Sequence, residues 1–324
     1  MENIKKFADK LIKAIEQYKK IVLYVHVVPD CDAIGSALAF KSFIDLNFKN
    51  KQVRIAGLNK LNFQYLPHFF HQNYESVTEE FANNSLGVVF DTTNYDRIYD
   101  KQFFNHSLSF RFDHHLFIKP ICTDELIDSS ASSTCELVGM FIQYTNLKIN
   151  SLVANSLYFG LLTDTIRFLT TNTNSNTYKT MTWLQESGCL DKKMVHDQLY
   201  LRTLSDFKLD KKLTKYIKYK SHYALMILNK HQTKKFGSNN IKSRLFLMAN
   251  LQEIFIFGII YYDDVTNVYK CSLRSRDYNV NAIAKKFSGG GHVLASGLKL
   301  NSKKDIKSLE YEIQKAIELK DKYA

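Results

Sequence analysis

The 324-residue chain has little tryptophan, proline or glycine, with one, three and twelve of these residues respectively. No stretch is biased enough in composition to form a low-complexity linker, and no internal repeat is visible. No apolar run approaches the roughly 18 residues that a membrane-spanning helix requires. With 45% hydrophobic and 23% charged residues, the chain has the composition of a globular protein, and we expect it to be soluble.

Cysteine is also scarce. The five cysteines are scattered, odd in number and without a C-x-x-C pair: Cys31, Cys122, Cys135, Cys189 and Cys271. This pattern favours reduced thiols in a cytoplasm over disulfides or a zinc site. Residues 1–20 place apolar side chains at helical spacing between charges, which predicts an amphipathic helix and not a signal peptide.

Positive charge is abundant, with a formal net charge of +12. A basic protein attracts phosphates and polyanions, although dispersed lysines usually form only a solvated surface. The densest basic run, residues 208–220, carries apolar residues at helical spacing, so we expect a helix whose lysines mostly face water.

The first candidate site follows a short apolar run. Residues 21–25 predict a buried parallel strand, and the pattern becomes helical over residues 33–43. His26, Asp30 and Asp32 lie between them, at the strand end where open α/β sheets bind ligands. Carboxylates with an imidazole suit Mn²⁺ or Mg²⁺, and the two carboxylates are able to face two different ions. The alternative is a helix N-cap beside an ordinary strand-end histidine.

A second strand is predicted over residues 52–57, and the strand after it, residues 85–90, ends in Asp91. A carboxylate at the end of a buried strand is costly without a partner, which makes Asp91 the candidate to bridge two metal ions. The alternative is a cap for a helix over residues 95–99.

The next strand, predicted over residues 108–112, ends in Asp113, His114 and His115. This triplet offers one carboxylate to orient an imidazole, one metal ligand and one imidazole that is free to meet a substrate. Because similar groups follow three strands, a chance arrangement becomes the weaker interpretation.

Two helix ends add candidates. Asp164 follows an apolar helix predicted over residues 151–162, where a metal would relieve an unpaired carboxylate; a solvated aspartate in a turn is the alternative. Ser133 and Glu136 have capping-box spacing at another helix start, and a phosphate bound there is the alternative to plain capping.

The second half predicts a smaller sheet, with strands over residues 222–228, 253–261 and 267–273. Arg274 follows the last strand, and three glycines precede a histidine further on: Gly289, Gly290, Gly291 and His292. The consecutive glycines predict a turn, and they let backbone N–H groups approach a phosphate, so this segment also predicts an anion site.

These patterns predict an α/β protein with two domains and a cleft between them. We expect an N-terminal parallel-sheet domain over residues 1–188, a helical connector over 189–220 and a smaller α/β domain over 221–324. Metal ligands on one wall of the cleft and a basic glycine segment on the other would limit the length of a ligand.

The order of these motifs resembles the DHH phosphoesterases that carry a DHH-associated C-terminal domain, DHHA1. The length and the Arg274-Ser275 and Gly-Gly-Gly-His segments resemble the NrnA-type nano-RNase and pAp-phosphatase branch of that family. The chain departs from the family pattern at Leu116, Ile166 and Ser288, where proline, glycine and glycine are common. None of these departures removes a ligand.

The resemblance implies a role for each candidate residue. One Mn²⁺ ion would be held by His26, Asp30 and Asp91, and a second by Asp32, Asp91, His114 and Asp164, with Mg²⁺ as the alternative metal. Asp113 and His115 would be the catalytic pair, with His115 at the scissile phosphate. The terminal phosphate or nucleotide would be bound by Arg274, Gly289, Gly290, Gly291 and His292.

The implied reaction is phosphoester hydrolysis by a water activated between two ions. The implied substrates are short oligoribonucleotides, cut one nucleotide at a time, and the 3′-phosphate of adenosine 3′,5′-bisphosphate (pAp), and the implied assembly is a homodimer. A cyclic or linear dinucleotide phosphodiesterase is an alternative; a pyrophosphatase is disfavoured because Arg274 and the glycine segment suit a nucleotide. A nucleic-acid-binding protein without turnover is the alternative of another class.

Overall fold

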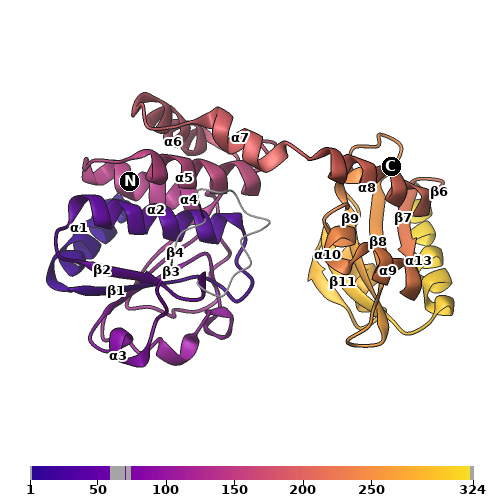
Figure 1. Cartoon of the computed structure of the whole chain (residues 1–324), viewed down its shortest axis with the longest axis horizontal. Helices are drawn as coiled ribbons and strands as arrows, with labels where there is room; N and C mark the ends of the chain where they lie inside the picture. Colours follow the sequence, from indigo (N-terminus) through magenta and orange to yellow (C-terminus); the bar gives the residue numbers. More distant parts are fainter. Residues whose placement is uncertain (1, 59–69, 71–73, 322–324) are drawn as a thin grey trace. The chain divides into compact units, whose positions relative to one another are not determined.

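The computed structural model describes residues 2–58, 70 and 74–321. The chain divides into two compact units, Met1–Leu201 and Arg202–Ala324, which are treated separately below (Figure 1). Among the described residues, no helix is both long and apolar enough to cross a membrane.

The first unit contains a five-stranded parallel sheet in the order β2-β1-β3-β4-β5. Its strands are β1 (Lys20–Tyr24), β2 (Gln52–Ile55), β3 (Leu86–Phe90), β4 (Ser109–Asp113) and β5 (Asp124–Ile127). The chain adds β2 on one side of β1 and β3 on the other. The strand order therefore reverses between β1 and β3, and such a switch point is where open α/β sheets open a crevice for ligands.

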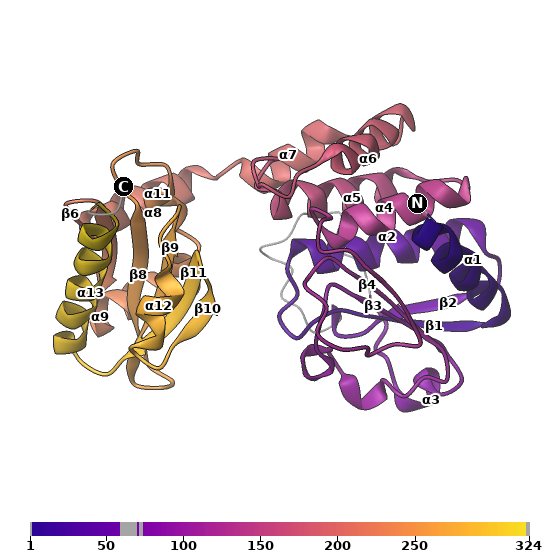
Figure 2. The same ribbon diagram turned by 180° about the vertical axis from the view of Figure 1, so that it is seen from behind.

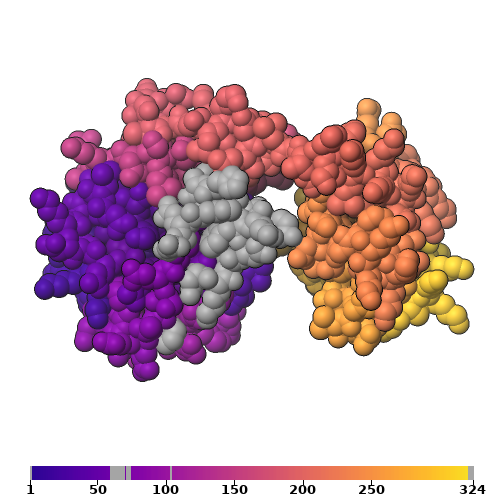
Figure 3. Space-filling view, viewed as in Figure 1, coloured from indigo at the N-terminus to yellow at the C-terminus, as the bar shows by residue number. Residues whose placement is uncertain are grey.

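One face of this sheet is covered by α1 (Glu2–Gln17), α2 (Cys31–Asn47) and α4 (Thr134–Thr145), with α5 (Ser151–Asp164) beyond (Figures 1 and 2). The short α3 (Glu79–Ala82) lies on the other face. Helix α2 is buried almost all round because it lies between the sheet and α5. Helices α6 (Ser175–Glu186) and α7 (Lys192–Tyr200) form an outer layer, seen in Figure 3.

Aromatic rings fill the space between α2 and the sheet. The ring of Phe40 lies 5.4 Å from that of Phe90, 5.8 Å from that of Phe112 and 5.6 Å from that of Phe141. Buried rings of this size contribute a large apolar area and geometrically specific contacts, so they hold α2 and the ends of β3 and β4 in fixed positions. Two short 3-10 helices, Tyr95–Arg97 and Lys101–Phe103, lie between β3 and β4.

The second unit contains a six-stranded sheet in the order β10-β11-β9-β8-β7-β6, antiparallel except for the parallel pair β7 and β8. Its strands are β6 (Ile217–Lys220), β7 (Tyr223–Leu228), β8 (Ile256–Asp263), β9 (Val268–Ser275), β10 (Gly290–His292) and β11 (Ala295–Leu300). The α/β prediction, with a parallel sheet in the first half and a second sheet in the other, is confirmed.

Helices cover both faces of the second sheet. Helices α12 (Val280–Lys285) and α13 (Lys303–Asp321) pack on one apolar face. The other face, around β7 and β8, is covered by shorter helices: α8 (Leu204–Leu213), α9 (Lys230–Phe236), α10 (Ser238–Lys242) and α11 (Phe246–Ala249). A 3-10 turn, Thr214–Tyr216, links α8 to β6.

The helical connector expected over residues 189–220 is helical only in part. It contains α7, α8 and the 3-10 turn, but its last residues form β6, which pairs with β7. Ile217 is buried while the lysines of this strand are exposed, as suits an edge strand whose charges face water. The glycine segment differs too, since Gly290–His292 is the edge strand β10 and not a turn.

Candidate functional site

The carboxyl ends of the central strands of the first sheet bring the predicted metal ligands together. His26 lies two residues after the end of β1, and its imidazole is buried. Asp30 caps the N-terminus of α2 by accepting hydrogen bonds from the backbone N–H groups of Asp32 and Ala33, both at 3.1 Å. The N-cap interpretation of Asp30 therefore holds, and its second oxygen, Oδ2, still lies 3.7 Å from Nε2 of His26.

Asp91 lies at the centre of the cluster, directly after β3, and is 3% exposed. Its two oxygens face different histidines: Oδ2 is 3.6 Å from Nε2 of His26, and Oδ1 is 3.5 Å from Nε2 of His114. Asp91 has a left-handed backbone with φ of 57°, which is uncommon outside glycine, although aspartate tolerates it better than most residues. The following 3-10 helix is capped by Asn94, so Asp91 is not its cap.

His114 joins the end of β4 to the end of α5. Its Nε2 lies 3.5 Å from Oδ2 of Asp164, the last residue of α5, and 3.9 Å from Oδ2 of Asp32. Three overlapping groups of side chains place their ligand atoms within 4.8 Å of one another: His26, Asp30 and Asp91; Asp32, His114 and Asp164; and Asp91, His114 and His115. These are carboxylate and imidazole donors, which suit a divalent cation such as Mn²⁺ or Mg²⁺.

Crowding of the carboxylates changes their protonation. Burial, followed by the charges of Asp91 and Asp164, raises the pKa of Asp32 well above its usual value. Burial likewise raises the pKa of Asp164 to about 6. Burial lowers the pKa of His26, but hydrogen bonding to Asp30 and Asp91 outweighs it and raises the value to about 9. A cluster in which protons offset the excess negative charge is one that a divalent cation would stabilise.

The carboxylate of Asp32 occupies the N-terminus of α4. It accepts hydrogen bonds from the backbone N–H groups of Thr134 at 2.7 Å and Cys135 at 2.8 Å. A phosphate is therefore not able to bind at this helix start in this structure, because the side-chain carboxyl group of Asp32 takes its place. Ser133 caps the helix by accepting from Glu136 N, whereas the Glu136 carboxylate turns instead to Ser132 and Thr177.

His115 is oriented by Asp113. Its Nδ1 lies 2.9 Å from Oδ1 of Asp113, which is fully buried at the end of β4. This hydrogen bond to Asp113 is the main cause of the raised pKa of His115. The His115 side chain is 42% exposed, so it is accessible to a substrate.

Two supporting residues were not predicted from the sequence. Arg111, fully buried in β4, lies 3.9 Å from Oδ2 of Asp113 and donates to Glu125 at 3.0 Å. Thr134 donates its hydroxyl to Oδ1 of Asp91. Arg111 was predictable in principle, because an arginine between two phenylalanines in a strand needs a carboxylate partner. Nothing in the sequence predicts the role of Thr134.

The structure places the predicted phosphate-binding residues on neighbouring strands of the second sheet. Arg274 of β9 pairs with Ala295 of β11, which in turn pairs with His292 of β10, so the three share one face. A side chain at Gly289 would clash with the carbonyl of Gly297, whereas a side chain at Gly290 would meet nothing within 4 Å. Gly290 therefore has an open surface that a ligand is able to approach.

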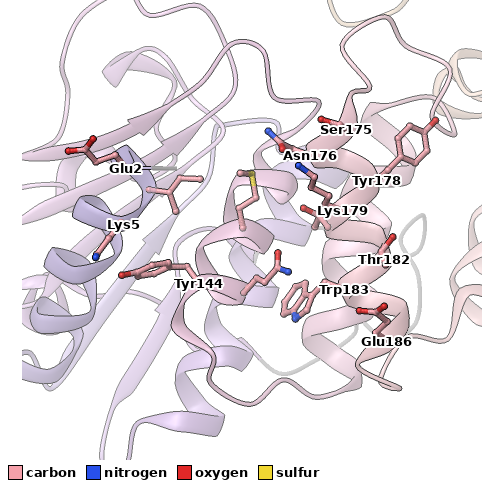
Figure 4. Close-up of a pocket in the computed structure, with 14 residues that line it drawn as sticks. Glu2, Lys5, Tyr144, Ser175, Asn176, Tyr178, Lys179, Thr182, Trp183 and Glu186 are labelled. Carbon is pink, nitrogen blue, oxygen red and sulfur yellow. The ribbon is translucent and has the colours of Figure 1, made fainter.

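A cavity of about 1060 Å³ lies elsewhere in the first unit, between α1, α4 and α6. Trp183, Tyr144 and Tyr178 line it, and none of the clustered carboxylates does (Figure 4). The volume of this cavity alone would therefore suggest a different site from the acidic cluster. The chemistry of the side chains identifies the candidate site. Trp183 is the single tryptophan of the chain, which makes it a reporter for unfolding of this unit.

Comparisons with known proteins agree with this arrangement. The model of the DHH family, N-terminal domain, matches residues 20–161, and the DHHA1 domain model matches residues 235–319. The chain is 32% identical over 305 residues to the uncharacterized protein MG371 of Mycoplasma genitalium, covering 94% of this chain and 93% of that protein. It is 30% identical to the bifunctional oligoribonuclease and PAP phosphatase NrnA of the same organism, covering 94% and 96%.

A solved structure shares the fold. An exopolyphosphatase-related protein from Bacteroides fragilis superposes with a TM-score of 0.81 at 24% identity, covering 97% of this chain and 96% of that one. The family predicted from the motifs is thereby confirmed: the chain belongs to the DHH family and carries a DHHA1 domain in its second half.

Proposed function

We propose that this protein is a metal-dependent phosphoesterase that hydrolyses short oligoribonucleotides to mononucleotides and removes the 3′-phosphate of pAp. The observation that carries the proposal is the convergence of carboxylates and imidazoles from four chain segments on one sheet edge. The name of the Mycoplasma genitalium relative, an oligoribonuclease and PAP phosphatase, supports the two substrates.

In this proposal two Mn²⁺ ions bind, with Mg²⁺ as the alternative. One ion would be held by His26, Asp30 and Asp91, and the other by Asp32, Asp91, His114 and Asp164. The two oxygens of Asp91 face His26 and His114 separately, which suits a carboxylate shared between two ions. Bound ions of this kind lower the pKa of a water molecule and offset charge on phosphoryl oxygens.

The remaining roles belong to side chains around the cluster. Asp113 accepts from Nδ1 of His115 and so leaves Nε2 of that ring to donate a hydrogen bond to the scissile phosphate. The raised pKa of His115 favours the protonated ring, which is the form that donates from both nitrogens. Thr134 and the N-terminus of α4 hold Asp91 and Asp32 in place, so little reorganisation is needed when a substrate arrives.

For the second unit, the proposal assigns binding of the terminal phosphate or nucleotide to Arg274, the glycine segment and His292. Arg274 and His292 share a face of the sheet, and the backbone at Gly290 is open to a phosphate. The proposal also includes a cytoplasmic homodimer, which the family resemblance supports and which light scattering of the purified protein tests.

The test is hydrolysis by the purified chain with Mn²⁺. Labelled RNAs of two to five nucleotides, pAp and a cyclic dinucleotide are incubated in parallel with the wild-type protein, the Asp91→Asn variant and the Asp96→Asn variant. Asp96 is an exposed carboxylate five residues away and serves as the matched control. The proposal is supported if the wild-type protein and the Asp96→Asn variant release mononucleotides and free phosphate and the Asp91→Asn variant does not. Cleavage of only the cyclic dinucleotide, or binding without turnover, overturns it.

A further inference from the structure

A second region of the second unit has the features of an anion site. A groove of about 440 Å³ lies between the start of β6, the N-terminus of α9 and the first turns of α13. Four lysines line it: Lys215, Lys218, Lys303 and Lys307. All four side chains belong to exposed residues, and Lys303 and Lys307 are one turn apart on the same face of α13.

Among the described residues, the positive charge of this groove exceeds the negative charge, with four lysines against one glutamate. Within the part of the chain that the structure describes, none of the four lysines is within ion-pair distance of a carboxylate, whereas other lysines of this unit, such as Lys270 and Lys286, are paired. Glu310 is the one carboxylate among the described lining residues. Because like charges repel, gathering four ammonium groups around a concave surface is favourable chiefly when an anion occupies it.

The amides of the groove reinforce this preference for an anion. Asn229 and Gln232 form the capping box of α9. The side-chain oxygen of Asn229 accepts from the backbone N–H of Gln232, and the side-chain oxygen of Gln232 accepts from the backbone N–H of Asn229, both at 2.9 Å. Each carbonyl oxygen already accepts one hydrogen bond, and each side chain also carries an NH₂ group that is able to donate to a ligand. The ammonium and NH₂ groups of the groove are hydrogen-bond donors, and phosphate oxygens are acceptors.

This groove is distinct from the surface of Arg274 and His292. Tyr269 lines the groove and belongs to the sheet face covered by α13. Arg274 lies five residues further along the same strand, and side chains an odd number of residues apart point to opposite faces of a sheet. The two sets of cationic groups therefore lie on opposite faces and are able to act independently.

We propose that this groove binds a chain of linked phosphates, either the phosphodiester backbone of single-stranded RNA or an inorganic polyphosphate. Four ammonium groups and two amide NH₂ groups match the repeated anionic oxygens of such a chain. The binding requires no metal ion, so it does not depend on the proposed catalytic activity.

The test measures binding in the presence of EDTA, which prevents cleavage by a metal-dependent site. A fluorescent twelve-nucleotide single-stranded RNA is titrated with the full-length protein at several salt concentrations, and unlabelled inorganic polyphosphate competes in a second arm. The double variant Lys218→Glu/Lys307→Glu is compared with Lys211→Glu/Lys304→Glu. Lys211 and Lys304 are exposed lysines of the same unit, and neither lines the groove, so both variants change the net charge equally.

We expect the groove variant to lose at least about tenfold in RNA affinity. Each phosphate contact contributes about 0.7 to the slope of log K against log salt for single strands, so the slope should fall by about 1.4. The control variant should keep the wild-type slope. If polyphosphate displaces RNA from the wild-type protein but not from the groove variant, inorganic polyphosphate is a ligand of the groove as well. Two results would overturn the proposal. One is an equal loss of affinity in the groove variant and the control variant, and the other is that neither variant loses affinity for RNA or for polyphosphate.

Discussion

The two units of this chain gather opposite kinds of charged group. The first unit buries carboxylates and imidazoles at the end of a rigid parallel sheet, with Asp91 3% exposed and Asp113 fully buried. The second unit exposes lysines around an open groove, and none of these lysines forms an ion pair with a carboxylate in the described part of the chain. Both arrangements are suited to binding phosphate. In the first, metal ions held by fixed ligands would bind it, and in the second, lysine ammonium groups would bind it directly. The comparison teaches that a buried site should fail abruptly when altered, and an exposed one gradually.

The largest effect should come from the shared carboxylate of the first unit. Asp91→Asn keeps the size of the side chain but removes a charge that faces both groups of ligands. Loss of a residue that only supports a ligand costs 10- to 100-fold, so we expect hydrolysis to fall by more than about 100-fold. Turnover rates with Mn²⁺ measure this, and unchanged far-UV circular dichroism verifies the fold. An Asp91→Asn enzyme as active as the Asp96→Asn control would contradict the role of Asp91.

The next effect concerns the stability of the first unit. Arg111→Met leaves Asp113 and Glu125 without their buried partner, which typically costs about 3–5 kcal/mol. Urea unfolding followed by Trp183 fluorescence measures the free energy of unfolding. Arg97→Met, at an exposed arginine of the same unit, should change stability by no more than about 0.5 kcal/mol. Equal effects of the two substitutions would mean that the buried network stabilises nothing.

A third pair of variants addresses the glycine segment of the second unit. Gly289→Ala would bring a methyl group against the carbonyl of Gly297 and within 2.7 Å of Cβ of Leu298, so we expect a loss of about 1–3 kcal/mol. Gly290→Ala should fold normally, because its side chain meets nothing within 4 Å. If a phosphate approaches this backbone, Gly290→Ala should raise KM for pAp without lowering the melting temperature. An unchanged KM would place the phosphate elsewhere.

The smallest effect should be a gain. Ile166 has φ of 48° and Ser288 has φ of 54°, and a left-handed backbone costs a residue with a Cβ about 1–2 kcal/mol. Glycine removes that cost but loses more entropy on folding, so Ile166→Gly and Ser288→Gly should each stabilise by about 0.5–1 kcal/mol. The midpoints of denaturant unfolding, followed by circular dichroism, measure both effects. Ile166 lies in the first unit and Ser288 in the second, so the two substitutions test both units. Destabilisation in both would show that the side chains contribute more than the backbone costs.

Much of the first unit was predictable because its signals are local. Short apolar runs followed by histidine or aspartate located β1, β3 and β4, and parallel strands bring their carboxyl ends to one edge. Strand β5 was missed because Asp124–Ile127 carries too few apolar residues to stand out. The hydrogen bonds from α4 to Asp32 were missed because they join residues about a hundred positions apart.

The second unit was harder to predict because its elements are short and its signals compete. Residues 217–220 continue a lysine-rich helical pattern but pair with β7, since tertiary pairing overrides weak helix propensity. The glycine segment indicated a turn, yet β11 is available beside it and draws Gly290–His292 into the sheet. The groove could not be predicted at all, because its lysines come from segments separated by more than eighty residues.

The hydrogen bonds from α4 to Asp32 have a consequence for how the metal site is maintained. The positive end of the helix acts as a permanent internal counterion, fixed by the covalent chain and always present at full occupancy. One of the crowded carboxylates is therefore held in place before any ion arrives. An ion entering such a site meets ligands that have already lost their conformational freedom, so more of its binding free energy remains as affinity.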